Sequence, residues 1–222
     1  MAQKEFALLL LGGPLGDETS ALEYARRAHR TLCADSGAEH AQKLGIPMNA
    51  IIGDLDSISS ETLLHFQKQK NPSCEIIQVP EQEHNDFEKT LTYLSERWNG
   101  AVRILGMTGG RTDHTISNFS VMLRYTDTFP SIEALDGEFI HSFLTTKHNQ
   151  RSIECPIGTT ISLMPFGEAK GVTTENLQYP LSNETLRLGE REGLSNISTA
   201  TPVSISMESG ALLISIQKPR NS

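Results

Sequence analysis

Hydrophobic and polar residues follow two different spacings along this chain. In the first half, short apolar runs alternate with stretches of helical spacing. The runs predict strands at Phe6–Leu11, Thr31–Ala34, Ile51–Ile52, Glu75–Val79, Val102–Leu105 and Ile132–Leu135. Because strands that alternate with helices usually form a parallel sheet, this half predicts a mostly parallel α/β domain over residues 1–136.

Two helices in this half have the clearest patterns. The first begins near Asp86, and its apolar stripe consists of Phe87, Leu91, Leu94 and Trp98. Its charged residues are expected to face water: Glu88, Lys89 and Glu96. The second helix begins at Thr112 or Asp113, with polar residues of its first turn as caps. One side of this helix carries Ile116, Phe119 and Leu123.

After about Gly137 the spacing changes to short alternating stretches, which are typical of strands with one buried face. They cover Glu138–Leu144, Thr160–Met164, Val203–Met207 and Leu212–Gln217, separated by Gly, Pro, Asn and Ser. The second half therefore predicts a smaller all-β domain over residues 137–222.

The composition is that of an ordinary globular protein, with 37% hydrophobic and 21% charged residues in 222 positions. The net charge of −8 and the lack of a Lys/Arg block argue against a nucleic-acid partner. Three widely spaced cysteines do not indicate a disulfide framework or a zinc site. The apolar run at Ala7–Leu11 is too short to span a membrane, and a signal-peptide pattern is lacking, so we expect a cytoplasmic protein without a membrane partner.

Candidate chemistry collects where expected strands end. The carboxyl ends of strands in an open α/β sheet line one crevice, so the turns at Asp35–Gly37, Gly53–Ser57 and Gly106–His114 can meet there. Asp54 and Asp56 lie on the same side if their segment stays extended, and two carboxylates suit Mg²⁺. The alternative is a turn whose acids cap a helix beginning near Ser59. Asp86 is likewise either a cation ligand or a helix cap.

The Gly106–His114 turn has backbone amides and a guanidinium, Arg111, that suit phosphate. It is not a Walker A loop, because the Lys-Ser/Thr ending is missing. His114 is either a nucleotide contact or a structural hydrogen-bonding residue. In the β half, the Leu177–Asn183 and Gly193–Ser198 segments are either simple turns or substrate contacts.

Six motifs in order resemble the bacterial thiamine pyrophosphokinase pattern, and together they span nearly the whole chain. They are Ala34-Asp35-Ser36-Gly37-Ala38, Leu44-Gly45-Ile46-Pro47, Ile51-Ile52-Gly53-Asp54-Leu55-Asp56-Ser57, Asn85-Asp86-Phe87-Glu88-Lys89-Thr90-Leu91, Gly109-Gly110-Arg111-Thr112-Asp113-His114 and Gly193-Leu194-Ser195-Asn196. The resemblance implies a nucleotide-binding α/β domain, a C-terminal β-sandwich that binds thiamine and forms the dimer, and a homodimer with active sites between subunits. It also implies transfer of a diphosphoryl group from ATP to the thiamine hydroxyl, with Mg²⁺, to give thiamine diphosphate and AMP.

The resemblance also implies roles for individual residues. Mg²⁺ and the triphosphate would be held by Asp54, Asp56 and Asp86. Asp35 would be a further acidic contact or would aid deprotonation of the hydroxyl. The nucleotide would be positioned by Ser57, Arg111, Asp113 and His114, and thiamine would be contacted by Ser195 and Asn196.

Two elements depart from the family pattern. Asp35-Ser36-Gly37 stands in place of Asp-Gly-Gly or Asp-Gly-Ala, and Glu83-His84-Asn85-Asp86 in place of Asp-x-Thr-Asp. These departures motivate one alternative, a thiamine or nucleotide sensor that has lost catalysis. A second alternative is another Mg²⁺-dependent phosphoryl- or glycosyl-transfer enzyme, because Asp-x-Asp also occurs in haloacid dehalogenase-like phosphatases and in glycosyltransferases.

Overall fold

The computed structural model describes residues 5–70 and 73–219. The chain has a mixed α/β fold and divides into two compact units, one through residue 137 and one from Glu138 onward. Among the described residues, no helix is both long and apolar enough to cross a membrane.

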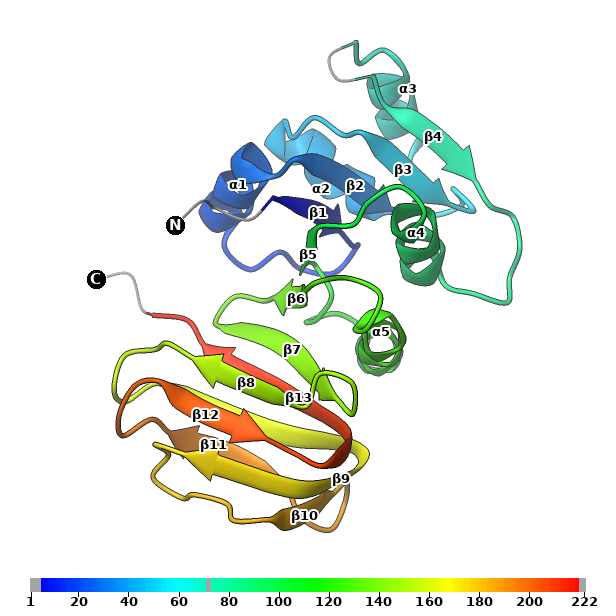
Figure 1. Ribbon diagram of the computed structural model, residues 1–222. Coiled ribbons are helices and arrows are strands. Elements are labelled where there is room, and N and C mark those ends of the chain that lie inside the picture. The colour runs from blue at the N-terminus through cyan, green and yellow to red at the C-terminus, as the bar shows by residue number, and fades with distance from the viewer. Residues whose placement is uncertain (1–4, 71–72, 220–222) are drawn as a thin grey trace. The chain divides into compact units, whose positions relative to one another are not determined.

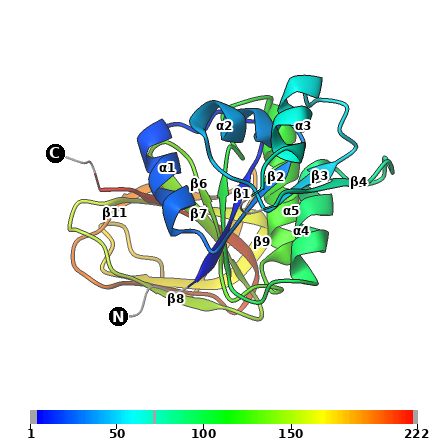
Figure 2. The same cartoon turned by 90° about the horizontal axis from the view of Figure 1, so that it is seen from above.

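The described residues of the first unit form six strands, and every pair of neighbouring strands in this sheet is parallel. In sheet order they are β4 (Glu75–Gln78), β3 (Ala50–Gly53), β2 (Arg30–Ala34), β1 (Phe6–Leu10), β5 (Ala101–Leu105) and β6 (Ile132–Leu135). The helices of this unit are α1 (Glu18–Arg27), α2 (Gly37–Leu44), α3 (Ser60–Gln67), α4 (Asp86–Ser95) and α5 (Thr112–Tyr125). Helices α1 to α3 lie on one face of the sheet, and α4 and α5 lie on the other (Figures 1 and 2).

Because helices cover both faces, the central strands are apolar throughout rather than alternating. All five residues of β1 are buried, and so are all four of β3. On α4 the expected stripe of Phe87, Leu91 and Leu94 is buried. Trp98 lies beyond the end of α4, where its Nε1 donates a hydrogen bond to the Ala101 carbonyl (2.9 Å).

One expectation about these helices is wrong, and the apolar side of α5 is only partly buried. Lys89 does not face water, because its side chain is only 4% exposed and pairs with Asp86. On α5, Ile116 is 60% exposed, and the apolar residues that the helix buries are Val121 and Met122. Helix α5 begins at Thr112 as expected, but no side chain caps it at Arg111.

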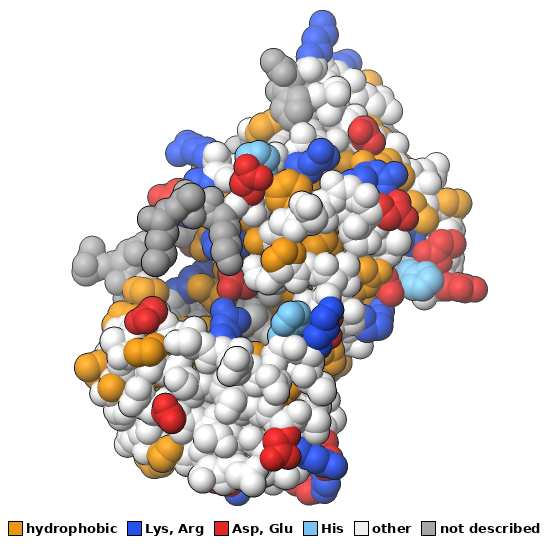
Figure 3. Space-filling view, in the orientation of Figure 1, with side chains coloured by type: hydrophobic (Ala, Val, Ile, Leu, Met, Phe, Trp, Pro, Cys, Tyr) orange, Lys and Arg blue, Asp and Glu red, His pale blue; other side chains and the backbone are white. Residues whose placement is uncertain are grey.

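The second unit contains antiparallel strands around one apolar cluster. Its strands are β7 (Phe139–Thr145), β8 (Gln150–Ile153), β9 (Thr160–Glu175), β10 (Glu184–Arg187), β11 (Gly193–Ile197), β12 (Val203–Ser206) and β13 (Ser209–Gln217). The long strand β9 pairs with four others, β10, β11, β12 and β13, and thereby organises the unit. On the face seen in Figure 3, Lys and Arg side chains are interspersed with Asp and Glu rather than gathered in one patch.

Candidate active site

A cavity of about 340 Å³ lies where several strands of the first unit end. Strands β1 and β5 are neighbours although α1 to α4 separate them in sequence, so the strand order reverses between them. Such a switch point leaves a crevice at the carboxyl ends of the strands. The cavity is lined from these ends by Gly12 and Gly13 after β1, Asp35 and Ser36 after β2, Ser57 after β3, and Gly106–Thr108 after β5.

Asp35 is the most buried acid of the cavity, with 4% of its surface exposed. Its Oδ1 is buried and has no hydrogen-bond partner among the described residues. Burial raises the pKa of Asp35, and the negative charges of Asp86, Asp54 and Asp56 raise it further. Its φ of 40° lies in the left-handed region, which costs energy for a residue with a side chain. A buried carboxylate oxygen without a donor is suited to a cation.

The turn after β3 places two more carboxylates beside Asp35. The chain does not stay extended here, because Leu55 has a φ of 67°. Asp54 Oδ1 accepts a hydrogen bond from the Asp56 amide (3.2 Å), which lowers the pKa of Asp54. Asp56 accepts a hydrogen bond from Ser57 Oγ (2.9 Å). One oxygen from each of Asp35, Asp54 and Asp56 lies within 4.8 Å of the others.

The structure does not support the alternative in which Asp54 or Asp56 caps a helix. The cap of α3 is Ser59, whose Oγ accepts from the Thr62 amide (3.1 Å). The cap of α4 is Asn85, whose Oδ1 accepts from the Glu88 amide (2.9 Å), so Asp86 is the first helical residue and not the cap.

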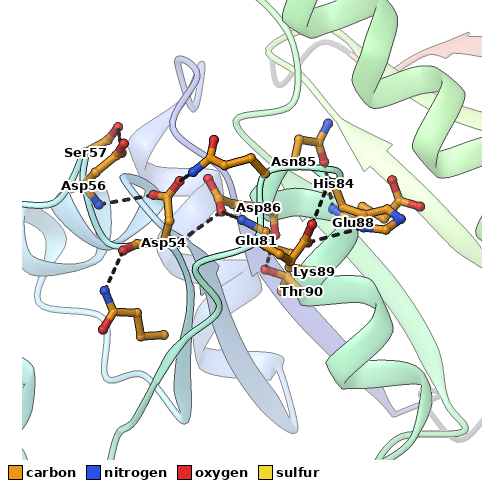
Figure 4. Close-up of polar contacts among 12 residues, drawn as sticks. Asp54, Asp56, Ser57, Glu81, His84, Asn85, Asp86, Glu88, Lys89 and Thr90 are labelled. Atoms are coloured by element: carbon orange, nitrogen blue, oxygen red, sulfur yellow. Dashed lines mark hydrogen bonds and ion pairs between the residues drawn. The ribbon is translucent and has the colours of Figure 1, made fainter.

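Asp86 lies against the same turn but is already bonded within the protein (Figure 4). Its Oδ1 accepts from the Asp54 amide (3.2 Å) and from Lys89 Nζ (3.1 Å). The convergent group of oxygens contains Asp35 rather than Asp86. The role of Asp86 as a metal ligand stays a prediction.

The loop after β5 contributes Arg111 to the cavity wall, and the first turn of α5 contributes His114. Arg111 Nε and Nη2 donate to the two oxygens of Asp113 (3.1 and 2.6 Å), and this pairing lowers the pKa of Asp113 to about 2. Asp113 therefore orients the guanidinium. Two glycines with positive φ, Gly106 (72°) and Gly109 (81°), allow the loop to turn.

A second cavity of about 460 Å³ shares Asn85 and Asp86 with the first. Its other lining residues include Asp54, Glu83, Lys89 and Arg124. The sequence did not predict two parts of these cavity walls. They are Lys89 of the second cavity and the Gly12-Gly13 pair of the first. The glycine pair follows an apolar run in the same way as the other motifs, and that signal was sufficient to find it.

In the second unit, Ser195 and Asn196 lie on β11. Asn196 is buried, and its side chain is bonded to the backbone of Tyr179: Oδ1 accepts from the Tyr179 amide (3.0 Å), and Nδ2 donates to the Tyr179 carbonyl (2.7 Å). Ser195 is exposed and has a φ of 53°. The contacts of both residues with thiamine stay predictions.

The carboxylates of Asp35, Asp54 and Asp56 fit a magnesium ion. Mg²⁺ prefers hard oxygen ligands and usually keeps several waters or phosphate oxygens in its octahedron. Three carboxylates that would otherwise repel one another, one with an oxygen lacking a partner, are compatible with such an ion.

Two family models match the chain. The "Thiamin pyrophosphokinase, catalytic domain" model matches residues 21–134, and the "Thiamin pyrophosphokinase, vitamin B1 binding domain" model matches residues 144–212. Among curated proteins, thiamine pyrophosphokinase 1 of Arabidopsis thaliana is 29% identical over 96% of this chain and 87% of its own length. Thiamine pyrophosphokinase of Bacillus subtilis is 25% identical over 93% of this chain and 95% of its own.

Solved structures share the fold. The crystal structure of Bacillus subtilis thiamine pyrophosphokinase superposes with a TM-score of 0.81 over 98% of this chain and 100% of that chain, at 23% identity. The yeast thiamin pyrophosphokinase structure also has a TM-score of 0.81, at 16% identity, over 98% of this chain and 87% of its own. The catalytic-domain model alone covers more than half of the chain, and the chain belongs to the thiamin pyrophosphokinase family.

Proposed function

We propose that this protein transfers a diphosphoryl group from ATP to the hydroxyl of thiamine, forming thiamine diphosphate and AMP. The observation that carries the proposal is the convergence of Asp35, Asp54 and Asp56 beside a cavity walled by glycine backbone. Family membership names the reaction, and this geometry supplies an acidic site for the metal-bound phosphates that the reaction requires.

In this proposal, Asp35, Asp54 and Asp56 hold Mg²⁺, with Asp86 adjacent as a further acidic contact. When bound, the ion offsets charge on the phosphates and on the group being transferred. Asp35 Oδ1, which is buried and has no hydrogen-bond partner among the described residues, supplies one of the oxygens for the cation. Asp54 and Asp56 are more exposed than Asp35 and supply further carboxylate oxygens to the cation.

The residues around the cavity orient the nucleotide. Gly12, Gly13 and Gly106 line the cavity without side chains, so a phosphate can approach the backbone closely there, although the Gly13 amide itself donates to the Gly106 carbonyl (2.9 Å). Arg111, held by Asp113, supplies a fixed positive charge, and His114 and Ser57 supply further hydrogen-bonding groups. Alignment of the hydroxyl with phosphorus contributes much of the remaining rate enhancement.

We propose further that residues 1–136 form the nucleotide- and metal-binding domain, and that residues 137–222 form a β-sandwich domain that binds thiamine and makes a homodimer. Ser195 is exposed on β11 and can contact thiamine, whereas Asn196 holds the Tyr179 segment beside it. A homodimer with active sites between subunits is part of this proposal, and so is a cytoplasmic location.

The proposal is tested by mass identification of the products formed from thiamine, ATP and Mg²⁺. We expect thiamine diphosphate and AMP. ADP, or the lack of a thiamine product with every nucleotide tried, contradicts the proposal. Asp54→Asn and Asp56→Asn should each lower turnover at least a hundredfold without unfolding the protein, whereas Glu23→Gln, an exposed acid of α1, should leave turnover unchanged.

The departures at Ser36, Glu83 and Asn85 leave one competing function, a sensor that binds thiamine or nucleotide without turnover. Ser36 lies in the cavity wall, and Asn85 caps α4 without displacing Asp86. Calorimetry that detects ligand binding in the presence of Mg²⁺, together with no product, would favour the sensor.

A further inference from the structure

A third cavity, of about 210 Å³, lies at the opposite ends of the strands from the acidic cluster. Its wall is formed around the first residues of β2, β3 and β4 and the end of α4, whereas the acidic cluster follows the last residues of β2 and β3. The volume is below the roughly 300–1,000 Å³ of cavities for drug-sized ligands, so this cavity suits a small ligand or a single functional group. The charged residues of its lining are Arg30, Arg97 and Glu75.

Arg30 supplies a positive charge that no carboxylate neutralises in the described part of the chain. It is the first residue of β2, and its exposed side chain makes no ion pair or hydrogen bond with a described residue. An unpaired guanidinium offers five N–H donors in a planar fork that matches the oxygens of an anion. Arg30 can therefore bind a ligand without giving up a partner within the protein.

Asn49 adds a donor whose direction is fixed by the other end of its side chain. Asn49 Oδ1 accepts from the Thr31 amide (2.8 Å) and from the Thr31 hydroxyl (3.4 Å). With the oxygen held there, Nδ2 lies on the other side of the amide group, and none of the described residues accepts a hydrogen bond from it. Because Asn49 precedes β3 and Arg30 begins the neighbouring β2, two unused donors lie in one cavity wall.

Arg97, just beyond the end of α4, is a second guanidinium of this wall and is held in place. Its guanidinium carbon lies 4.2 Å from the centre of the Tyr93 ring, and Nη1 donates to the Tyr93 carbonyl (3.2 Å) and to Glu96 (2.7 Å). The Tyr93 hydroxyl donates to Glu75 (3.0 Å). Burial and Glu75 raise the pKa of Tyr93, partly offset by the charges of Arg97 and Arg30, so the phenol keeps its proton and Glu75 keeps this donor.

We propose that the third cavity binds a phosphate group, with Arg30 and Asn49 Nδ2 donating to its oxygens and Arg97 adding positive charge. One guanidinium fork is enough for a planar carboxylate, whereas donors on separate elements suit a tetrahedral group with several acceptor oxygens. Two arginines against Glu75 leave the lining with a net positive charge, which favours an anion. The phosphate group belongs either to inorganic phosphate or to a small phosphate ester.

The test is an NMR titration of the isotope-labelled whole protein with inorganic phosphate, in EDTA and at constant ionic strength. We expect saturating shifts of the backbone amides of Arg30, Asn49 and Glu75. Glycerol phosphate is titrated in the same way, and the ligand with the lower Kd identifies the source of the group as an ester or as the free ion. Sodium acetate, which offers a carboxylate instead, should not saturate these shifts.

Two variants remove the donors. Arg30→Gln should weaken phosphate binding roughly tenfold or more, since it deletes a charged hydrogen-bond donor. Asn49→Asp keeps an oxygen for Thr31 but replaces the Nδ2 donor with a second oxygen and adds negative charge, so it should weaken binding by a similar factor. Arg26→Gln, which removes an exposed arginine of α1, is the charge-matched control for Arg30→Gln and should bind as the wild type does.

Equal phosphate binding by the wild type and Arg30→Gln would overturn the proposal, and so would equal saturation by acetate. Shifts confined to Gly12, Gly13 and Arg111 would also overturn it, because they would place the anion in the first cavity. Circular dichroism and a denaturation curve identify a variant that has failed to fold, and Asn49→Asp decides the test if Arg30→Gln is that variant. The proposed function does not enter this inference, since none of the residues that follow the carboxyl ends of the strands takes part in it.

Discussion

Replacing Asp35 with asparagine should stabilise the protein in the absence of metal. Asp35 is buried, and its carboxylate lies with those of Asp54 and Asp56 in a group whose oxygens are within 4.8 Å of one another. At that distance two unit charges repel by about 1 kcal/mol in water and by about 3.5 kcal/mol at an effective dielectric constant of about 20. Because Asp54 and Asp56 are open to solvent, the lower figure applies to each pair.

Two such repulsions predict that Asp35→Asn raises the free energy of unfolding by about 2 kcal/mol, since asparagine keeps the shape and removes the charge. With Mg²⁺, the wild type should become more stable than Asp35→Asn, because a cation that binds the folded wild type more tightly than the variant stabilises the wild type more. The same change should abolish most thiamine turnover, a trade of activity for stability that is common at active sites.

Urea denaturation curves with EDTA and with excess Mg²⁺ measure both effects. Glu23→Gln, which removes an exposed carboxylate on α1, serves as the matched control and should change neither curve. The reasoning is refuted if Asp35→Asn is no more stable than the wild type in EDTA, or if its advantage persists unchanged in Mg²⁺.

Three further predictions concern packing, thiol chemistry and a buried amide. Gly37→Ala should lower the free energy of unfolding by about 3 kcal/mol or more, because the new methyl group would meet a backbone oxygen at 2.1 Å. Gly110→Ala places its methyl group in open space, so denaturation curves should show a much smaller loss for this control. Burial raises the pKa of Cys74 to about 11, so its alkylation rate, followed by mass spectrometry, should still be increasing at about pH 10, and a plateau near pH 9 contradicts this. Asn196→Ala should lower the free energy of unfolding by about 1–3 kcal/mol, because the amide and carbonyl of Tyr179 lose their partner. Asn99→Ala, at an exposed position, should leave the same denaturation curve unchanged.

The central strands of the first unit could be predicted from the sequence because they are buried on both faces and are therefore largely apolar. The run at Phe6–Leu11 corresponds to β1 and that at Ile132–Leu135 to β6. The sequence also showed that polar turns follow these strands, and in a parallel sheet the turns must share one edge. For this reason the sequence could predict that Asp35 lies close to the Asp54–Asp56 turn.

The environment of individual side chains could not be predicted from the sequence. Helical spacing assigned Lys89 to the solvent face of α4, but it does not say that Asp86, three residues earlier, offers a partner that makes burial tolerable. Spacing also placed Ile116 on an apolar side, although the residues that α5 buries lie further along the helix. For Lys89, a contact specific to the three-dimensional site outweighs the period of the helix.

The acidic cluster itself depends on backbone conformations that the Asp-x-Asp spacing does not contain. In an extended chain, residues two apart point the same way, but here the φ of 67° at Leu55 folds the segment so that the Asp56 amide reaches Asp54 Oδ1. Gly53 then lies between two acids, since a methyl group there would be 2.9 Å from Asp35 Cβ and 3.2 Å from Asp86 Oδ1. Gly53 lets Asp35 and Asp86 approach the turn, and the positive φ at Leu55 brings Asp54 and Asp56 together beside Asp35, so the cluster of Asp35, Asp54 and Asp56 depends on backbone geometry. An alanine at position 53 should move Asp35 out of that cluster even with every carboxylate retained.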